Sequence, residues 1–234
     1  MRQQHDPWES GASWWLDVIA DDPIYVTDVL PLLRLLITAP AGPWLDVGCG
    51  DGRAAAALPA PQFGCDIAPE LLSVAARHMP VMRSRIPDLH CLRARTFAGA
   101  SLVLVLEHVR ELIGTFAALR RTVATGGELV VIANHPAFTA PDSGPIIDPT
   151  DGEVLWRWGP YFDSQTVATH VGGRQVPFHH RPIGTILTAA AEGGWCLEAL
   201  EERPLSVAAV EHEPGYYGQQ YLPRLAGFRW RNPE

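Results

Sequence analysis

Near the N-terminus the apolar residues are spaced as on helices. Residues 1–40 are predicted to be an N-terminal helical segment that ends in the stretch APAGP (39–43). Asp22 and Pro23 suit a helix start, as a capping carboxylate and a residue for the first helical position. Two sets of apolar residues each share one helix face: Trp14, Trp15, Val18 and Ile19, then Val29, Leu32, Leu33, Leu36 and Ile37.

From Trp44 onward, short apolar runs alternate with helical patterns. The runs predict strands that are buried on both faces: WLDV (44–47), QFGC (62–65), SLVLVL (101–106) and ELVVIAN (128–134). A weak strand is also expected within 81–92. Helices are predicted at RAAAAL (53–58), at ELLSVAARHM (70–79) and along Leu112, Phe116, Leu119 and Val123. Such alternation predicts an α/β fold in which helices cover both faces of a parallel sheet.

The pattern changes after Asn134. Residues 135–181 are rich in Pro, Gly, His and Trp and show no long helical period. They are predicted to form an irregular insertion over the strand ends, with short strands such as RQVPFHH (174–180). A helix (181–194) that ends at a Gly pair, a strand WCLEALEE (195–202) and a last strand within 221–232 complete the prediction. We expect residues 1–234 to form a single domain.

Composition and charge exclude several classes of ligand. The chain has a net charge of −8, which disfavours nucleic acid and anionic membrane surfaces. All 18 basic residues are arginine, so a P-loop lysine and a pyridoxal phosphate lysine are both excluded. The four cysteines form no C-x-x-C pair, and no metal site is expected. Reduced thiols, a polar N-terminus and no apolar stretch long enough to cross a bilayer favour a cytoplasmic protein.

The turn after the first predicted strand combines glycines with carboxylates. The sequence WLDVGCGDGR (44–53) has glycine at 48, 50 and 52 and acids at Asp46 and Asp51. A dinucleotide site would need glycine where Arg53 stands, and Asp51 would repel a pyrophosphate. S-adenosylmethionine fits better, because it has a ribose and positive charge but no phosphate. Asp66 follows Asp46 by 20 residues at the end of the next strand, where a carboxylate would hold both ribose hydroxyls.

At this point the sequence resembles the class I S-adenosylmethionine-dependent methyltransferases, of the small-molecule type. The matching stretches are LDVGCGDGR (45–53), FGCDIAPELLSVAARH (63–78), LVLVLEHV (102–109) and LRRTVATGGELVVIANH (119–135). A looser likeness extends over residues 179–204. The resemblance implies a Rossmann-like, mostly parallel seven-stranded sheet with an antiparallel last strand, here Leu225 to Arg231.

The resemblance also implies roles for residues at the strand ends. One group would lie along the cofactor: Asp46, Gly48, Gly50 and Asp51. A second would bind the adenosine, with Asp66 on the ribose, Ile67 packed on the adenine, and Asp88 with Leu89 beside the adenine amine. A third would follow the fourth strand beside the methionine end: Leu106, Glu107 and His108.

Methyl transfer from a sulfonium is an in-line displacement, to which an enzyme contributes mainly proximity and alignment. A weakly acidic hydroxyl acceptor would need a base, and histidine is the residue for that at neutral pH. We expect His180 and His108 to be the catalytic candidates, with His179 as an alternative to its neighbour. These histidines could equally be structural. The insertion (135–181) is expected to cover a small-molecule acceptor.

Two other functions remain open from the sequence. A non-catalytic S-adenosylmethionine-binding protein would need the same cofactor motifs. A nicotinamide-dependent oxidoreductase is disfavoured by Asp51 and Arg53. No nucleic-acid or membrane partner is expected. The sequence indicates neither the acceptor, nor the atom methylated, nor an oligomeric state.

Overall fold

The computed structural model describes residues 8–9, 12–20, 22–38, 42–212 and 216–233. Parts of the predicted N-terminal helical segment, residues 1–7, 10–11, 21 and 39–40, lie outside the described residues. The same holds for residues 39–41 of the stretch predicted to end that segment. The remainder of the segment contains α1 (Ser13–Ile19), a π-helical turn η1 (Tyr25–Val29) and α2 (Leu30–Leu36).

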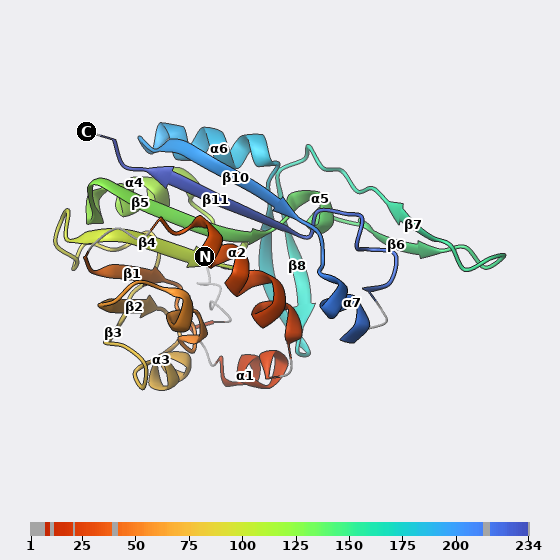
Figure 1. Ribbon diagram of the computed structural model, residues 1–234, viewed down its shortest axis with the longest axis horizontal. Coiled ribbons are helices and arrows are strands. Elements are labelled where there is room, and N and C mark those ends of the chain that lie inside the picture. The colour runs from red at the N-terminus through yellow and green to blue at the C-terminus, as the bar shows by residue number, and fades with distance from the viewer. Residues whose placement is uncertain (1–7, 10–11, 21, 39–41, 213–215, 234) are drawn as a thin grey trace, which may run out of the picture.

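A seven-stranded sheet forms the centre of the molecule, with the strand order β10-β11-β5-β4-β1-β2-β3 (Figure 1). All neighbours pair in parallel except β11, which is antiparallel to both β10 and β5. This confirms the mostly parallel sheet and the antiparallel last strand. The strands are β1 (Trp44–Val47), β2 (Gln62–Asp66), β3 (Val81–Arg83), β4 (Phe97–Val103), β5 (Val123–Asn134), β10 (Cys196–Arg203) and β11 (Leu225–Arg231).

Helices cover both faces of this sheet, as predicted from the buried strands. Alternate side chains of β5 enter two separate cores, because successive residues of a strand point to opposite faces. Leu129 and Val131 pack in the core that includes α4 (Leu112–Thr122) and α6 (Ile183–Glu192). Val130 and Ile132 pack in the core that includes α2. The remaining helices are α3 (Pro69–Ala75), α5 (Pro136–Thr139) and α7 (Val207–His212).

Residues 53–58 do not form the predicted α-helix. Residues Arg53–Ala57 form the 3₁₀ turn η2 instead. Gly52 has a left-handed backbone (φ +82°) before the turn, and Leu58 is already extended before Pro59. A residue that precedes proline is disfavoured in the α region, so only five residues remain for helix. A 3₁₀ turn is the usual structure over so short a span.

The insertion is more regular than predicted. It contains one hairpin of β6 (Gly144–Ile147) with β7 (Val154–Arg157), and a second of β8 (Gln165–Val171) with β9 (Arg174–His180). Only β9 was predicted, and its bounds match. The other strands are exposed or half-buried along most of their length, so they lack a buried face and its alternating pattern. Gly172 and Gly173, both with positive φ, are the turn signal that could have revealed the second hairpin.

The second hairpin reaches from the edge of the sheet to the N-terminal segment. In Figure 1, β8 runs from beside the sheet towards α1, whereas β6 and β7 project away from the body. The tip of the β8–β9 hairpin touches α1: a Cβ added to Gly172 would lie 2.7 Å from Val18 and 2.8 Å from Trp14. The hairpin therefore bridges two parts of the chain that are distant in sequence.

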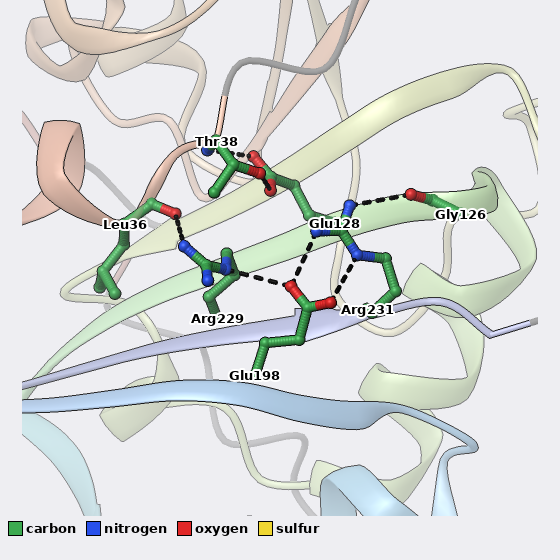
Figure 2. Close-up of polar contacts among 7 residues, drawn as sticks. All are labelled: Leu36, Thr38, Gly126, Glu128, Glu198, Arg229 and Arg231. Carbon is green, nitrogen blue, oxygen red and sulfur yellow. Dashed lines mark hydrogen bonds and ion pairs between the residues drawn. The ribbon is translucent and has the colours of Figure 1, made fainter.

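A polar network holds the end of α2 to the sheet (Figure 2). The buried carboxylate of Glu128 accepts hydrogen bonds from the backbone N–H (3.0 Å) and the hydroxyl (2.5 Å) of Thr38. Arg229 of β11 donates to the carbonyl of Leu36 (3.2 Å), a favourable place for a cation because it is the helix C-terminus. Glu198 accepts from Arg229 and Arg231. The N-terminal segment is thus anchored to β5 and β11.

Candidate active site

A cavity of about 400 Å³ lies at the carboxyl ends of β1, β2, β3 and β4. The strand order reverses between β1 and β4, and ligands of open α/β sheets bind at such a switch point. Its floor consists of residues that follow these strands, within 46–54, 66–67, 84–86 and 103–110. Its walls come from elsewhere in the chain: Trp8, Trp15, Ile19, Asp22 and Tyr25 of the N-terminal segment, and Pro177 and His179 of β9.

The glycine turn after β1 is shaped by two glycines with different constraints. Gly48 has φ +72°, and a Cβ there would lie 2.6 Å from the side chain of Val105, so both conformation and space require glycine. Gly50 has φ +53°, but the nearest atom to an added Cβ is 4.0 Å away on Leu71. Its positive φ alone favours glycine. Both residues line the cavity, where the bare backbone lets a ligand approach closely.

Asp66 ties the glycine turn to the end of β2. One carboxylate oxygen accepts the N–H of Gly50 (2.9 Å) and the other accepts the N–H of Ala68 (2.8 Å). The carboxylate thus connects the ends of two strands through backbone N–H groups. Asp66 and Ile67 both line the cavity, as predicted for residues that contact adenosine.

Asp46 is a buried carboxyl group in the cavity floor, 1% exposed. Ser101 donates to one of its oxygens (2.7 Å) and itself accepts from the Trp44 indole N–H (3.0 Å). The second oxygen is buried and has no hydrogen-bond partner. Burial raises the pKa of Asp46 to about 7, opposed by the Ser101 hydrogen bond and assisted by the charge of Asp66. A cationic ligand in the cavity would favour the ionised form.

We predict that Asp46 makes the free protein less stable as pH rises. Its pKa in the folded state lies above the unfolded value, so the folded protein binds the extra proton between about pH 4 and 7. That stabilisation is present below the unfolded pKa and is lost as pH rises through the folded pKa. Relative to Asp46→Asn, which still accepts from Ser101, wild type should lose up to roughly 1.4 kcal/mol per pH unit. Urea unfolding of both proteins at pH 5 to 8 measures this, and parallel pH profiles would contradict it.

Asp51 lines the cavity as a member of an ion pair. Its carboxylate is paired with Arg53, Nη2 to Oδ2 at 2.9 Å, and accepts from Nε as well. Arg53 also donates to the carbonyl of Ile19 (3.2 Å), and its guanidinium lies 5.0 Å from the ring centroid of Tyr25. Asp51 therefore lines the cavity but also connects the glycine turn to the N-terminal segment through Arg53.

Several predicted residues lie away from this cavity. Asp88 has a side chain that is 72% exposed, and Leu89 is buried in the core at 1% exposure. The contacts predicted for them with the adenine amine are not supported by this placement. Three more residues line a separate cavity of about 20 Å³: Leu106, Glu107 and His180.

The buried positions of Glu107 and His180 suit a structural role. Glu107 accepts from the backbone and side-chain amides of Asn134, both at 2.7 Å, and so fixes the end of β5. His180, 1% exposed, donates through Nε2 to the carbonyl of Tyr161 (2.8 Å). His180 lines the small cavity and not the large one, so its catalytic role stays a prediction without support from this placement.

His108 and His179 do line the large cavity. The Nδ1 of His108 lies 3.1 Å from the carbonyl of Pro177, which can only accept, so Nδ1 carries the proton. In neutral imidazole Nε2 is then free to accept a proton. His179 is hydrogen-bonded to the hydroxyl of Thr166 (2.7 Å). Burial, with a contribution from Arg181, lowers the pKa of His179 to about 4, so it is neutral at pH 7.

Aromatic residues of the N-terminal segment complete the site and were not predicted as site residues. Trp8 lies edge-on to His108, with ring centroids 5.2 Å apart, and also contacts Trp14 and Trp15. The adjacent Glu9 pairs with Arg83 (3.1 Å), the last residue of β3, and with Arg85 (2.5 Å), which follows that strand. No motif marks these residues, because their place in the site depends on the chain folding back over the sheet.

Within the part of the chain that the structure describes, no cluster of three or more His, Cys, Asp or Glu side chains is placed to hold a metal ion. In the same residues, no helix has both the length and the apolar character needed to cross a bilayer.

Comparisons with known proteins agree with this geometry. A family model for a methyltransferase domain matches residues 45–131. An S-adenosylmethionine-dependent methyltransferase from Mesorhizobium loti is 25% identical, with a TM-score of 0.75 over 86% of this chain and 96% of that one. A search of curated proteins found no match.

Two more distant neighbours share the fold. A proposed S-adenosylmethionine-dependent methyltransferase from Listeria monocytogenes has a TM-score of 0.72 at 20% identity, over 86% of this chain and 96% of that one. A glycopeptide N-methyltransferase complexed with S-adenosylmethionine has a TM-score of 0.58 at 14% identity, over 88% and 95%.

The seven-stranded order, the glycine turn and Asp66 occur together with the match to a methyltransferase domain. The match does not favour a non-catalytic binding protein or a nicotinamide enzyme. The comparisons and the geometry together support a class I S-adenosylmethionine-dependent methyltransferase.

Proposed function

We propose that this methyltransferase acts on a small-molecule acceptor, which binds in the same cavity as the cofactor between the N-terminal aromatic residues and the β8–β9 hairpin. The observation that carries the proposal is the continuity of one cavity from Asp66 at one side to His108 and His179 at the other. About 400 Å³ is at the lower end of the range for small-molecule sites. The cofactor would occupy much of that volume, which favours a small acceptor.

The residues present suit the cofactor. Asp66 would accept the ribose hydroxyls, and Ile67 would pack on the adenine. Gly48 and Gly50 would let the backbone approach the methionine part. The unpartnered buried oxygen of Asp46 provides negative charge for a cationic ligand. When bound, S-adenosylmethionine supplies an electrophilic methyl group.

The acceptor side is lined by rings and imidazoles. Trp8, Trp15 and Tyr25 provide flat, largely apolar surfaces that suit an aromatic or otherwise planar acceptor. The β8–β9 hairpin closes the site from the other side and limits the access of water. These residues would hold the acceptor atom in line with the reacting bond, which is the main contribution expected of the enzyme.

His108 is the base that we propose for an acceptor whose nucleophilic atom carries a proton. The carbonyl of Pro177 holds the proton on Nδ1, which leaves the Nε2 lone pair free. The acceptor would form its bond to the methyl carbon as the carbon–sulfur bond breaks, and Nε2 would take the acceptor's proton. His179, whose lowered pKa leaves it neutral at pH 7, is the second candidate on the same wall.

Ligand binding and label transfer together test the proposal. A ligand that binds only the folded state raises the melting temperature. S-adenosylhomocysteine should therefore raise it and NAD should not. The full-length protein, given S-adenosylmethionine with a labelled methyl group, should then label members of a library of planar alcohols, phenols and amines. Stabilisation by NAD alone would contradict the cofactor assignment, and label found only on protein or RNA substrates would contradict the small-molecule acceptor.

A further inference from the structure

We propose that Arg181 is a positioning residue, whose guanidinium fixes the loop that carries His108 against the end of β9. This inference rests on the proposed function, because it concerns the orientation of the proposed base. Arg181 follows β9 directly, and it lines the small cavity behind the active site instead of the large one. It therefore acts through other residues and does not itself touch a ligand in the active site.

Four backbone carbonyls surround the Arg181 guanidinium. One terminal nitrogen donates to Val109 (2.5 Å) and Arg110 (2.8 Å). The other donates, at 3.4 Å each, to Leu106 and to His179. Three of these four acceptors belong to the loop between β4 and α4, and the fourth belongs to β9. A single side chain thus connects the two segments that supply both candidate bases.

The guanidinium supplies donors to loop carbonyls, of which those of Leu106 and Val109 belong to buried residues. Residues 106–108 form a single 3₁₀ turn, η3, which provides few internal hydrogen bonds. Buried or half-buried carbonyls without a donor are costly. The planar guanidinium offers five donors in a fixed arrangement, whereas a lysine ammonium is a compact charge on a flexible stem. Arginine at this position therefore supplies geometry that lysine cannot reproduce.

A second contact makes the loop and β9 act as one unit. His108 donates through Nδ1 to Pro177, three residues before His180 in the same strand. With Arg181 in place, the loop is attached to β9 on two sides of the imidazole ring. Loss of the guanidinium would leave His108 with its bond to Pro177 and its edge-on contact with the ring of Phe178 (centroids 5.9 Å apart), and the imidazole could then change its orientation and tautomer more readily.

The charge of Arg181 provides a second, separable observable. His179 is surrounded by Arg181, His108 and Arg110 as cations or potential cations, and by Glu111 as an anion. Burial is the largest cause of its lowered pKa, and Arg181 is the next. Removing the charge should raise the pKa of His179, whereas replacing arginine with lysine should leave it low. The two substitutions therefore separate the effect of the guanidinium hydrogen bonds from the effect of the positive charge.

The experiment compares Arg181→Met, which removes charge and donors, with Arg181→Lys, which keeps the charge only. Arg157→Met is the matched control, because Arg157 is an exposed arginine in the other hairpin. The full-length proteins are labelled with ¹⁵N-histidine, and the imidazole spectra report the tautomer and pKa of each ring. His108→Asn and His179→Asn assign the signals. Calorimetry measures the affinity of each protein for S-adenosylhomocysteine, and melting curves measure its stability.

We expect His108 of wild type and of Arg157→Met to show only the Nδ1-protonated form at pH 8. In both Arg181 variants the signal should broaden or indicate mixed tautomers, while the affinity for S-adenosylhomocysteine changes by less than about threefold. The pKa of His179 should rise in Arg181→Met alone. A misplacement of about 1 Å would slow methyl transfer roughly 10²-fold once an acceptor is known.

An unchanged His108 tautomer and line width in Arg181→Lys would overturn the inference. The inference would also be overturned if both variants showed a lower affinity for S-adenosylhomocysteine together with a lower melting temperature, since that would indicate a general structural role. Arg181→Lys keeps the test decisive if Arg181→Met does not fold. Failure of the proposed function would be seen elsewhere, as unchanged turnover in His108→Asn with the tautomer result intact.

Discussion

Asp66→Ala is expected to weaken binding of S-adenosylhomocysteine by about 10²-fold or more. Two charge-assisted hydrogen bonds to the ribose are at stake, each worth about 1.5–3 kcal/mol. The same substitution removes the acceptors for the N–H groups of Gly50 and Ala68, so the glycine turn should also loosen. Titration calorimetry measures the affinity, with Glu192→Ala as a control carboxylate that is exposed near the end of α6.

An analogue without the two ribose hydroxyls separates the direct contact from the loosened turn. Wild type should lose most of its affinity for that analogue, whereas Asp66→Ala should bind both ligands about equally weakly, as coupled partners do in a double-mutant cycle. If Asp66→Ala still distinguishes the two ligands as wild type does, the ribose assignment is wrong. If its affinity for S-adenosylhomocysteine matches wild type, both roles of Asp66 are refuted.

His108→Asn is expected to slow methyl transfer by about 10²-fold to 10⁴-fold, for an acceptor that must lose a proton. Asparagine places an amide N–H near the position of Nδ1, so the hydrogen bond to Pro177 is retained while Nε2 is removed. Cofactor affinity should therefore stay within about threefold of wild type. The rate–pH profile should also lose the limb that reports the base. Initial rates with the acceptor found by the labelling screen measure both effects.

His180→Asn is the comparison that decides between the two histidines. His180 is buried and bonded to Tyr161, so its replacement should lower the melting temperature and leave turnover of the folded protein largely intact. A large loss of turnover in His180→Asn with an unchanged melting curve would restore the base predicted from the sequence. Normal turnover in His108→Asn would remove His108 from the mechanism.

The sheet could be predicted from the sequence because each strand is encoded locally. The apolar runs predicted at 44–47 and 128–134 lie in β1 and β5, where the residues are mostly buried. The run predicted at 101–106 overlaps β4 only up to Val103, because β4 spans Phe97–Val103. Asp66 could be predicted as well, because the position after a strand is specified by the strand itself. The same rule explains why Asp88 does not line this cavity. β3 already ends at Arg83, so the residues that reach the cavity after it are 84–86.

Other parts of the site depend on contacts between distant segments. Arg121 of α4 donates to the carbonyls of Leu89 and Leu92, which holds their segment against the core. The contact of Trp8 with His108 and those of Arg181 with Val109 and Arg110 are of the same kind: each joins residues more than 60 positions apart. Periodicity and motif spacing describe only neighbours in the chain, so neither could indicate these contacts.

The buried carboxyl group of Asp46 has a consequence for product inhibition. Methyl transfer turns a sulfonium into a neutral thioether, so the donor carries one more positive charge than the product. A group whose pKa lies near 7 is mostly neutral in mild acid and mostly ionised in mild alkali. Ionised Asp46 should hold the donor more tightly than the product, and protonated Asp46 should discriminate less. We therefore expect the enzyme to be most readily inhibited by its own product in mild acid, and to be relieved of it as the solution becomes alkaline.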